Sequence, residues 1–218
     1  MKHDFWRERW QNDQIGFHEK DGNKLLLRHF ESIELPVGSR YFLPLCGKTG
    51  DIAQLLIKGY RIVGVELVEK AIIQLFDELG VVPDVSETGP FKRYNAPDID
   101  IHVGDVFDLT AEFLGPVDAV YDRAALVAFP PDMRERYAAH LAEITHQAQQ
   151  MLITFEYDQS DMDGPPFNVH EGEVRALYEA DYEIELVRRK VIPQGLKGQV
   201  AANETVWLLK GRPLQTEN

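Results

Sequence analysis

Between residues 40 and 66 the sequence reads RYFLPLCGKTGDIAQLLIKGYRIVGVE. Residues 40–45 form an apolar, β-rich run, and a turn that contains two glycines follows at once. A short amphipathic pattern comes next and stops at Gly59, as a helix does. Residues 61–65 then form a second apolar run, which ends at Glu66. This order predicts a strand, a turn, a helix and a parallel strand, the unit from which α/β proteins are built.

The rest of the chain repeats the same alternation. We expect further strands at 99–103, 117–121 and 151–155, and a helix after the two prolines at 130 and 131, where Asp132 and Glu135 resemble a capping box. Other expected segments are a helix between 68 and 79, a surface excursion at 81–98, a helix with Val174, Leu177 and Tyr178, and an antiparallel strand pair at 184–191 and 205–209. The fold class is therefore α/β, with a mostly parallel sheet that helices cover on both faces.

Length and composition limit the class of protein further. The chain has 218 residues, of which 44% are hydrophobic, so we expect a single domain over residues 1–218 with a substantial core. Residues 1–35 precede the first strand as a helical extension or lid. The 23 Lys and Arg residues against 36 Asp and Glu give a net charge of -13, which argues against nucleic acid and anionic membranes as partners. One cysteine and no signal-like segment favour a soluble, cytoplasmic protein.

Carboxylates follow most of the expected parallel strands, at the edge of the sheet where α/β proteins bind ligands. Four of the five strand ends carry one, at Glu66, Asp105, Asp122 and Asp158. Each could be a helix cap or a solvated loop residue, but their recurrence favours a binding site for a hydroxyl-rich or cationic ligand. Glu66 is the strongest candidate, because it lies about 20 residues beyond the glycine turn, where nucleotide-binding folds place the acid that binds the ribose.

The glycine turn does not fit a phosphate-binding loop. Gly47-Lys48-Thr49 would need a glycine at position 42 to complete G-x-x-x-x-G-K-[ST], and Phe42 stands there. The dinucleotide fingerprint G-x-G-x-x-G is also absent. S-adenosylmethionine contains no pyrophosphate, carries a sulfonium cation and keeps a ribose for Glu66, so it fits this turn better than a dinucleotide does.

Four more residues near the expected site have two interpretations each. Arg123 could form an ion pair with Asp122 or contact an anionic group of cofactor or substrate. Trp10 and Phe17 could pack on the domain or close over a flat ligand. Cys46 could act as a nucleophile, although no histidine is placed to activate it, and packing under the ligand is the better interpretation. The histidines lack metal-ligand spacing, so we expect no metal.

Several motifs together resemble the thiopurine S-methyltransferase family, in its bacterial branch. They are FLPLCGK at 42–48, VGVE at 63–66, YDRAALV at 121–127, GPPF at 164–167, the aromatic segment at 5–10 and GFH at 16–18. The resemblance implies a class I S-adenosylmethionine-dependent methyltransferase with a Rossmann-like, seven-stranded sheet. It also implies methyl transfer to the sulfur of aromatic or heterocyclic thiols such as thiopurines, and in bacterial members to selenium or tellurium compounds.

The same resemblance implies roles for individual residues. The cofactor contacts would be Trp10, Leu45, Glu66, Arg123 and the pair Asp105 and Val106, with Phe17 toward the substrate and Arg123 also able to stabilise or bind a thiolate. The segment 193–197 offers no match for a second arginine of vertebrate members. We expect a small-molecule substrate and a monomer. Two rival functions remain at this point, an NAD(P)-dependent oxidoreductase and a non-catalytic protein that binds the cofactor or a nucleotide.

Overall fold

The computed structural model describes residues 3–212. The chain divides between Tyr121 and Asp122 into two compact units. Within the described range, no helix is both long and apolar enough to cross a membrane.

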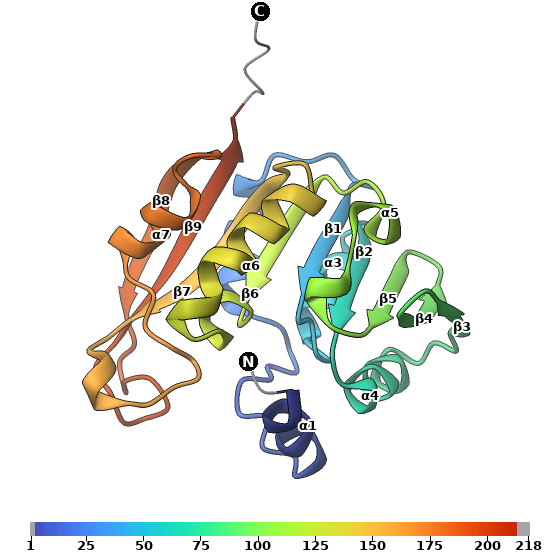
Figure 1. Ribbon diagram of the computed structural model, residues 1–218, viewed down its shortest axis with the longest axis horizontal. Helices are drawn as coiled ribbons and strands as arrows, with labels where there is room; N and C mark the ends of the chain where they lie inside the picture. The colour runs from blue at the N-terminus through green and yellow to red at the C-terminus, as the bar shows by residue number, and fades with distance from the viewer. Residues whose placement is uncertain (1–2, 213–218) are drawn as a thin grey trace, which may run out of the picture. The chain divides into compact units, whose positions relative to one another are not determined.

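The first unit contains the parallel part of the sheet (Figure 1). Strand β1 (Arg40–Pro44) pairs in parallel with β2 (Arg61–Glu66) on one side and with the start of β6 (Ala119–Arg123) on the other. Strand β5 (Ile99–Val103) follows β2, again in parallel. The strand order therefore reverses between β1 and β6, which is where open α/β sheets leave a crevice for a ligand.

Helices α3 (Gly50–Ile57) and α4 (Glu69–Leu79) connect these strands. Each buries one apolar stripe, and α4 ends at Gly80, whose left-handed conformation terminates the helix as its sequence predicts. Smaller helices complete this unit. They are α1 (His3–Gln11), α2 (Lys24–His29), η1 (Phe30–Ser32), η2 (Val106–Asp108) and α5 (Ala111–Leu114).

The expectation of a surface excursion at 81–98 is wrong. This segment contains β3 (Asp84–Thr88) and β4 (Phe91–Ala96), a hairpin whose second strand pairs antiparallel with β5. Its polar composition suggested a loop, because only Phe91 and Tyr94 of this hairpin are buried. The hairpin accounts for the two strands beyond the expected seven, so the described chain has nine.

The second unit holds a further antiparallel group of three strands and two α-helices. Strand β9 (Asn203–Gly211) lies between β7 (Gln149–Glu156) and β8 (Tyr182–Val191), as the sequence predicts for a closing pair. Helices α6 (Pro131–Ile144) and α7 (Glu171–Tyr178) and the short η3 (Leu126–Ala128) and η4 (Gln159–Asp161) connect them.

Two details of α6 differ from the expectation. The predicted capping box is wrong, because the cap lies two residues before Asp132, at Pro130, and makes no side-chain hydrogen bond. Arg134 is also buried in the apolar face, where its Nε donates to Phe129 O (2.9 Å) and its Nη1 donates to Glu173 Oε1 (2.6 Å). The helix thus carries a fully desolvated, hydrogen-bonded charge that its hydrophobic pattern did not reveal.

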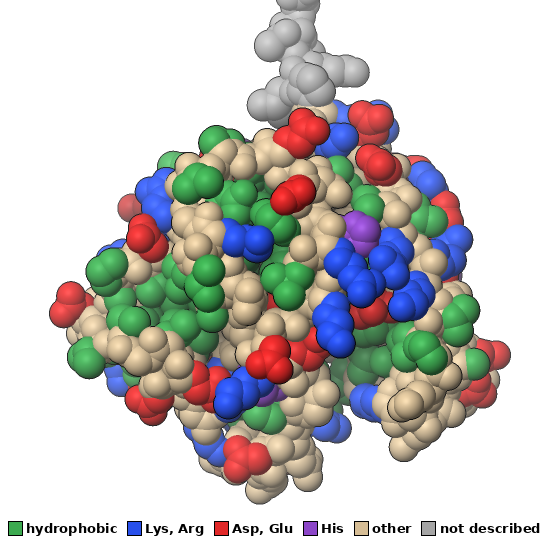
Figure 2. Space-filling view, turned by 180° about the vertical axis from the view of Figure 1, so that it is seen from behind, with side chains coloured by type: hydrophobic (Ala, Val, Ile, Leu, Met, Phe, Trp, Pro, Cys, Tyr) green, Lys and Arg blue, Asp and Glu red, His purple; other side chains and the backbone are tan. Residues whose placement is uncertain are grey.

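Not all apolar side chains are buried. Val82 and Ile57 are 93% and 80% exposed, and the face in Figure 2 shows apolar side chains between groups of both charges, including one group of Lys and Arg. Single exposed apolar residues are normal on protein surfaces and need no partner to explain them.

The loop around residue 20 packs directly on the start of α3. The backbone N–H of Gly50 donates to Glu19 O (3.2 Å), and a Cβ at position 50 would lie only 2.1 Å from Lys20 O. A glycine is therefore required where the N-terminal segment approaches the glycine turn.

We predict that Gly50→Ala lowers the free energy of unfolding by about 1–3 kcal/mol, because the backbone must shift to relieve the overlap. Gly16→Ala is the matched control, since a Cβ there would meet nothing within 4 Å, and it should change stability by less than about 0.5 kcal/mol. Urea unfolding of the two variants measures both values, and equal stabilities would contradict the close approach.

Candidate functional site

Glu66 is the last residue of β2, and its side chain turns back onto two backbone donors. Its Oε2 accepts from the N–H of Gly47 and its Oε1 accepts from the N–H of Val68, both at 2.9 Å. The residue is only 6% exposed. Each oxygen keeps a further lone pair, so the carboxylate can still accept hydrogen bonds from a ligand.

Burial controls the charge of this carboxyl. Loss of solvation raises the pKa of Glu66 from 4.5 to about 7, although hydrogen bonds from the backbone of Val68, Gly47 and Leu67 oppose the shift. Near neutral pH the group is therefore poised between its protonated and ionised forms.

The turn after β1 has an unusual backbone. Leu45 has a φ of 49° and Gly47 a φ of 52°, both in the left-handed region. This conformation is costly for a leucine, and such residues concentrate at functional sites. It aims the N–H of Gly47 at Glu66, so the turn holds the carboxylate rather than a phosphate.

Cys46, between them, is buried and has the properties of a packing residue. Burial, and next the neighbouring charge of Glu66, raise the pKa of its thiol well above the ordinary value. The thiol stays protonated at neutral pH, so it does not provide a thiolate nucleophile.

Asp51 is a buried residue that sequence reasoning missed. It is fully buried at the start of α3, where Oδ1 accepts from the N–H of Asn23 and Oδ2 accepts from the hydroxyls of Thr49 (3.0 Å) and Tyr121 (3.2 Å). Asp51 therefore ties the N-terminal segment and β6 to the glycine turn. Its partners lie up to 70 residues away in sequence, so no local motif could reveal it.

The aromatic residues of the N-terminal segment form one cluster over the turn. Trp10 is 2% exposed and packs with Val68 and Ala71, and the rings of Trp6 and Trp10 both meet Phe17 edge to face at 5.8 Å. The indole of Trp10 also covers the turn, since a Cβ on Gly47 would lie 3.1 Å from its ring. The same Cβ position would lie 4.0 Å from Glu66 Oε2, so the side chains of Trp10 and Glu66 both lie next to Gly47.

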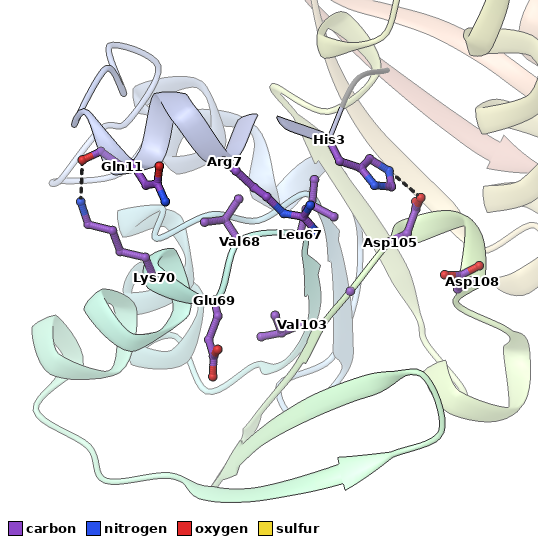
Figure 3. Close-up of a pocket in the computed structure, with 11 residues that line it drawn as sticks. His3, Arg7, Gln11, Leu67, Val68, Glu69, Lys70, Val103, Asp105 and Asp108 are labelled. Atoms are coloured by element: carbon purple, nitrogen blue, oxygen red, sulfur yellow. Dashed lines mark hydrogen bonds and ion pairs between the residues drawn. The ribbon is translucent and has the colours of Figure 1, made fainter. Parts of the chain in front are cut away.

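A pocket of about 600 Å³ opens between α1 and the carboxyl ends of β2 and β5 (Figure 3). Glu66 is not one of its lining residues, although the next two residues, Leu67 and Val68, are. Its lining residues are His3, Arg7, Gln11, Leu67, Val68, Glu69, Lys70, Val103, Gly104, Asp105 and Asp108. His3 Nε2 lies 2.8 Å from Asp105 Oδ2, while Asp105 Oδ1 accepts from the N–H of Phe107 (3.0 Å). Asp105 therefore fixes the η2 turn and holds the start of α1; Val106, the next residue, is buried.

Arg123 belongs to the second unit. The structure places Asp122 and Arg123 as the last two residues of β6, not beyond its end, and Ala124 follows with a φ of 62°. The residue is half-buried. The carboxyl of Asp122 accepts from the N–H of Leu126 (3.0 Å) and the hydroxyl of Tyr137 (2.8 Å), and burial raises its pKa to about 6.

These arrangements define the chemistry that the first unit can support. A buried carboxylate with two spare lone pairs suits two neighbouring hydroxyls, and the pocket that Leu67 and Val68 line is large enough for a flat heterocycle. Within residues 3–212, no group of three or more His, Cys, Asp or Glu side chains is arranged to hold a metal ion.

Comparison with solved structures gives the class of the fold. The structure of 1,6-didemethyltoxoflavin-N1-methyltransferase from Burkholderia thailandensis, with S-adenosylhomocysteine bound, aligns with a TM-score of 0.64 at 16% identity, over 96% of this chain and 87% of that one. An S-adenosylmethionine-dependent methyltransferase from Anabaena variabilis aligns with a TM-score of 0.62 at 14% identity, covering 96% and 95%. The fold is that of a class I S-adenosylmethionine-dependent methyltransferase.

Sequence comparison identifies the family. The thiopurine S-methyltransferase family model matches residues 1–212. Thiopurine S-methyltransferase from Xanthobacter autotrophicus is 54% identical over 96% of this chain and 99% of its own length, and that from Teredinibacter turnerae is 47% identical over 96% and 97%. The chain belongs to the thiopurine S-methyltransferase family, whose methyl donor is S-adenosylmethionine. Neither the oxidoreductase nor the non-catalytic alternative is favoured.

The pKa of Glu66 leads to a stability prediction that Glu66→Gln tests. Below pH 4.5 the carboxyl is protonated in both the folded and the unfolded chain, whereas above about pH 7 it is ionised in both and its burial opposes folding. The wild type should therefore lose about 3 kcal/mol of stability relative to the variant as the pH rises from 4.5 to 7. Urea unfolding at several pH values measures this difference, and a difference that stays constant would rule out the raised pKa.

Proposed function

We propose that this protein transfers the methyl group of S-adenosylmethionine to the sulfur of a small aromatic or heterocyclic thiol. The observation that carries the proposal is the buried carboxylate of Glu66 beside a glycine turn without a phosphate-binding pattern. Family membership supports the same reaction, because the curated relatives are named for S-methylation of thiopurines.

The residues around Glu66 fit this cofactor. Glu66 would accept hydrogen bonds from the two ribose hydroxyls, and Asp105 with Val106 would lie near the adenine. Trp10 and Leu45 would contact the part of the cofactor over the glycine turn, and Arg123 would contribute from the end of β6. Of these residues, Asp105 lines the pocket, whereas Trp10, Leu45 and Glu66 lie at the glycine turn.

When bound, S-adenosylmethionine supplies a methyl group that its sulfonium charge makes electrophilic. The chain's part is to hold the acceptor sulfur in line with that methyl group and to exclude water, which can lower the barrier by several kcal/mol. Heterocyclic thiols ionise near neutral pH, so a strong general base is not required. Arg123 would stabilise or bind the thiolate through its guanidinium.

The acceptor site is proposed around Phe17, which forms the edge of the aromatic cluster and is half-buried. Selenium and tellurium compounds are proposed as further acceptors, because these atoms are soft nucleophiles as sulfur is. We also propose that the chain works as a monomeric, cytoplasmic, single methyltransferase domain, with residues 1–35 as its lid and without a nucleic-acid partner, in keeping with its charge of -13.

A labelled transfer assay tests the reaction. The purified protein is incubated with S-adenosylmethionine that carries a labelled methyl group and with a panel of 6-mercaptopurine, thiophenols and the corresponding aromatic selenols and tellurols. We expect label in a thioether product of the aromatic thiols. Transfer to none of these acceptors, with a folded protein, would refute the proposal.

The proposed role of Glu66 predicts a pH-dependent affinity for the cofactor. The ionised carboxylate accepts hydrogen bonds from both ribose hydroxyls, whereas the protonated form loses an acceptor. The affinity for S-adenosylhomocysteine should therefore rise several-fold between pH 6 and pH 8, through the pKa of about 7. Glu66→Gln should bind about tenfold or more weakly at pH 8 and lose this pH dependence. Calorimetric titration measures both, and an unchanged affinity would remove Glu66 from the site.

The proposed role of Arg123 predicts a different kinetic pattern. Arg123→Gln should lower kcat/KM for an aromatic thiol by about 10- to 100-fold, which is the effect of a lost hydrogen bond to a charged group. The affinity for S-adenosylhomocysteine should change less. Steady-state kinetics and calorimetry separate the two, and a loss confined to cofactor affinity would show that Arg123 does not act on the thiol.

A further inference from the structure

Lys70 occupies a position that its own helix does not favour. It is the second residue of α4, where the helix dipole prefers an acidic side chain such as that of Glu69, the first residue. A lysine at this position weakens the helix slightly, so the contacts that explain Lys70 must lie outside α4.

The ammonium group of Lys70 leaves α4 and binds the carboxyl-terminal end of α1. Lys70 Nζ donates to Trp10 O (2.8 Å) and Gln11 O (3.4 Å), and it lies 3.0 Å from Asp13 Oδ1. Trp10 and Gln11 are the last two residues of α1, whose final carbonyls have no partner within the helix. A cation at this end also complements the dipole of α1.

Trp10 therefore connects Lys70 to the glycine turn and Glu66. The carbonyl of Trp10 accepts from Lys70 Nζ at 2.8 Å and, at the longer distance of 3.4 Å, from the N–H of Asp13. The indole of Trp10 covers Gly47, whose N–H donates to Glu66. At its other end α1 is held separately, by His3 on Asp105. Figure 3 shows the contact of Lys70 with Gln11 on one side of the pocket and that of His3 with Asp105 on the other.

We propose that Lys70 is a positioning residue for the cofactor site, because its ammonium group holds the end of α1 and thereby keeps the indole of Trp10 on the Gly47 turn. This inference rests on the proposed function. Lys70 acts through the backbone of Trp10, and its side chain remains on the pocket wall.

Four variants separate this role from a general effect on folding. Lys70→Met removes the donor and keeps the length of the side chain, and Lys70→Arg restores a donor. Asp13→Asn removes the ion pair and leaves the carbonyl contacts. Lys210→Met is the matched control, since Lys210 also pairs with an acid, Glu185, but lies in the second unit.

Two measurements are made on each variant. Calorimetry gives the affinity for S-adenosylhomocysteine, and acrylamide quenching reports the exposure of Trp10. Quenching is measured in a Trp6→Phe background, where the other tryptophan, Trp207, is fully buried.

Lys70→Met should weaken S-adenosylhomocysteine binding about tenfold and increase the quenching of Trp10, with kcat at saturating cofactor within about twofold of the wild type. Lys70→Arg, Asp13→Asn and Lys210→Met should stay within about threefold for affinity. Unchanged affinity or unchanged quenching in Lys70→Met would overturn the proposal. If the wild type itself does not bind S-adenosylhomocysteine, the proposed function fails instead, and quenching still shows whether Lys70 holds Trp10.

Discussion

The candidate site depends on one buried carboxylate held by two backbone N–H groups. Glu66 accepts from Gly47, in the turn after β1, and from Val68, in the turn before α4. These bonds join the ends of two neighbouring parallel strands into one rigid corner, and they leave the outer lone pairs of the carboxylate for a ligand. Because the group is also desolvated, its hydrogen bonds are stronger and its ionisation is easier to perturb than at the surface.

Much of the fold could be predicted from the sequence, because buried parallel strands have short, almost continuously apolar sequences. Strands β1, β2 and β5 follow such runs, and Glu66 stands where the last apolar residue of β2 is followed by a polar one. The β3–β4 hairpin could not be found in the same way. It is an edge element with few buried residues, so its sequence is as polar as that of a loop.

The residues that sequence reasoning missed share a different property. Asp51, Lys70 and Arg134 are polar residues inside helices, and their partners lie up to 70 residues away. A helical pattern shows which face is apolar, but it does not show which group a buried carboxylate or the charged end of a long cationic side chain contacts. For these positions only the tertiary structure identifies the partner, although a lysine in the first turn of α4 was a local irregularity that could have been noticed.

The central claim is that Glu66 binds the ribose of the methyl donor. A crystal structure of the protein with S-adenosylhomocysteine tests it most directly. The account predicts that both carboxylate oxygens of Glu66 lie about 2.5–3.0 Å from the two ribose hydroxyls, with the indole of Trp10 against the ligand. A ribose bound elsewhere, or a Glu66 side chain that contacts only Gly47 and Val68 in the complex, would contradict it.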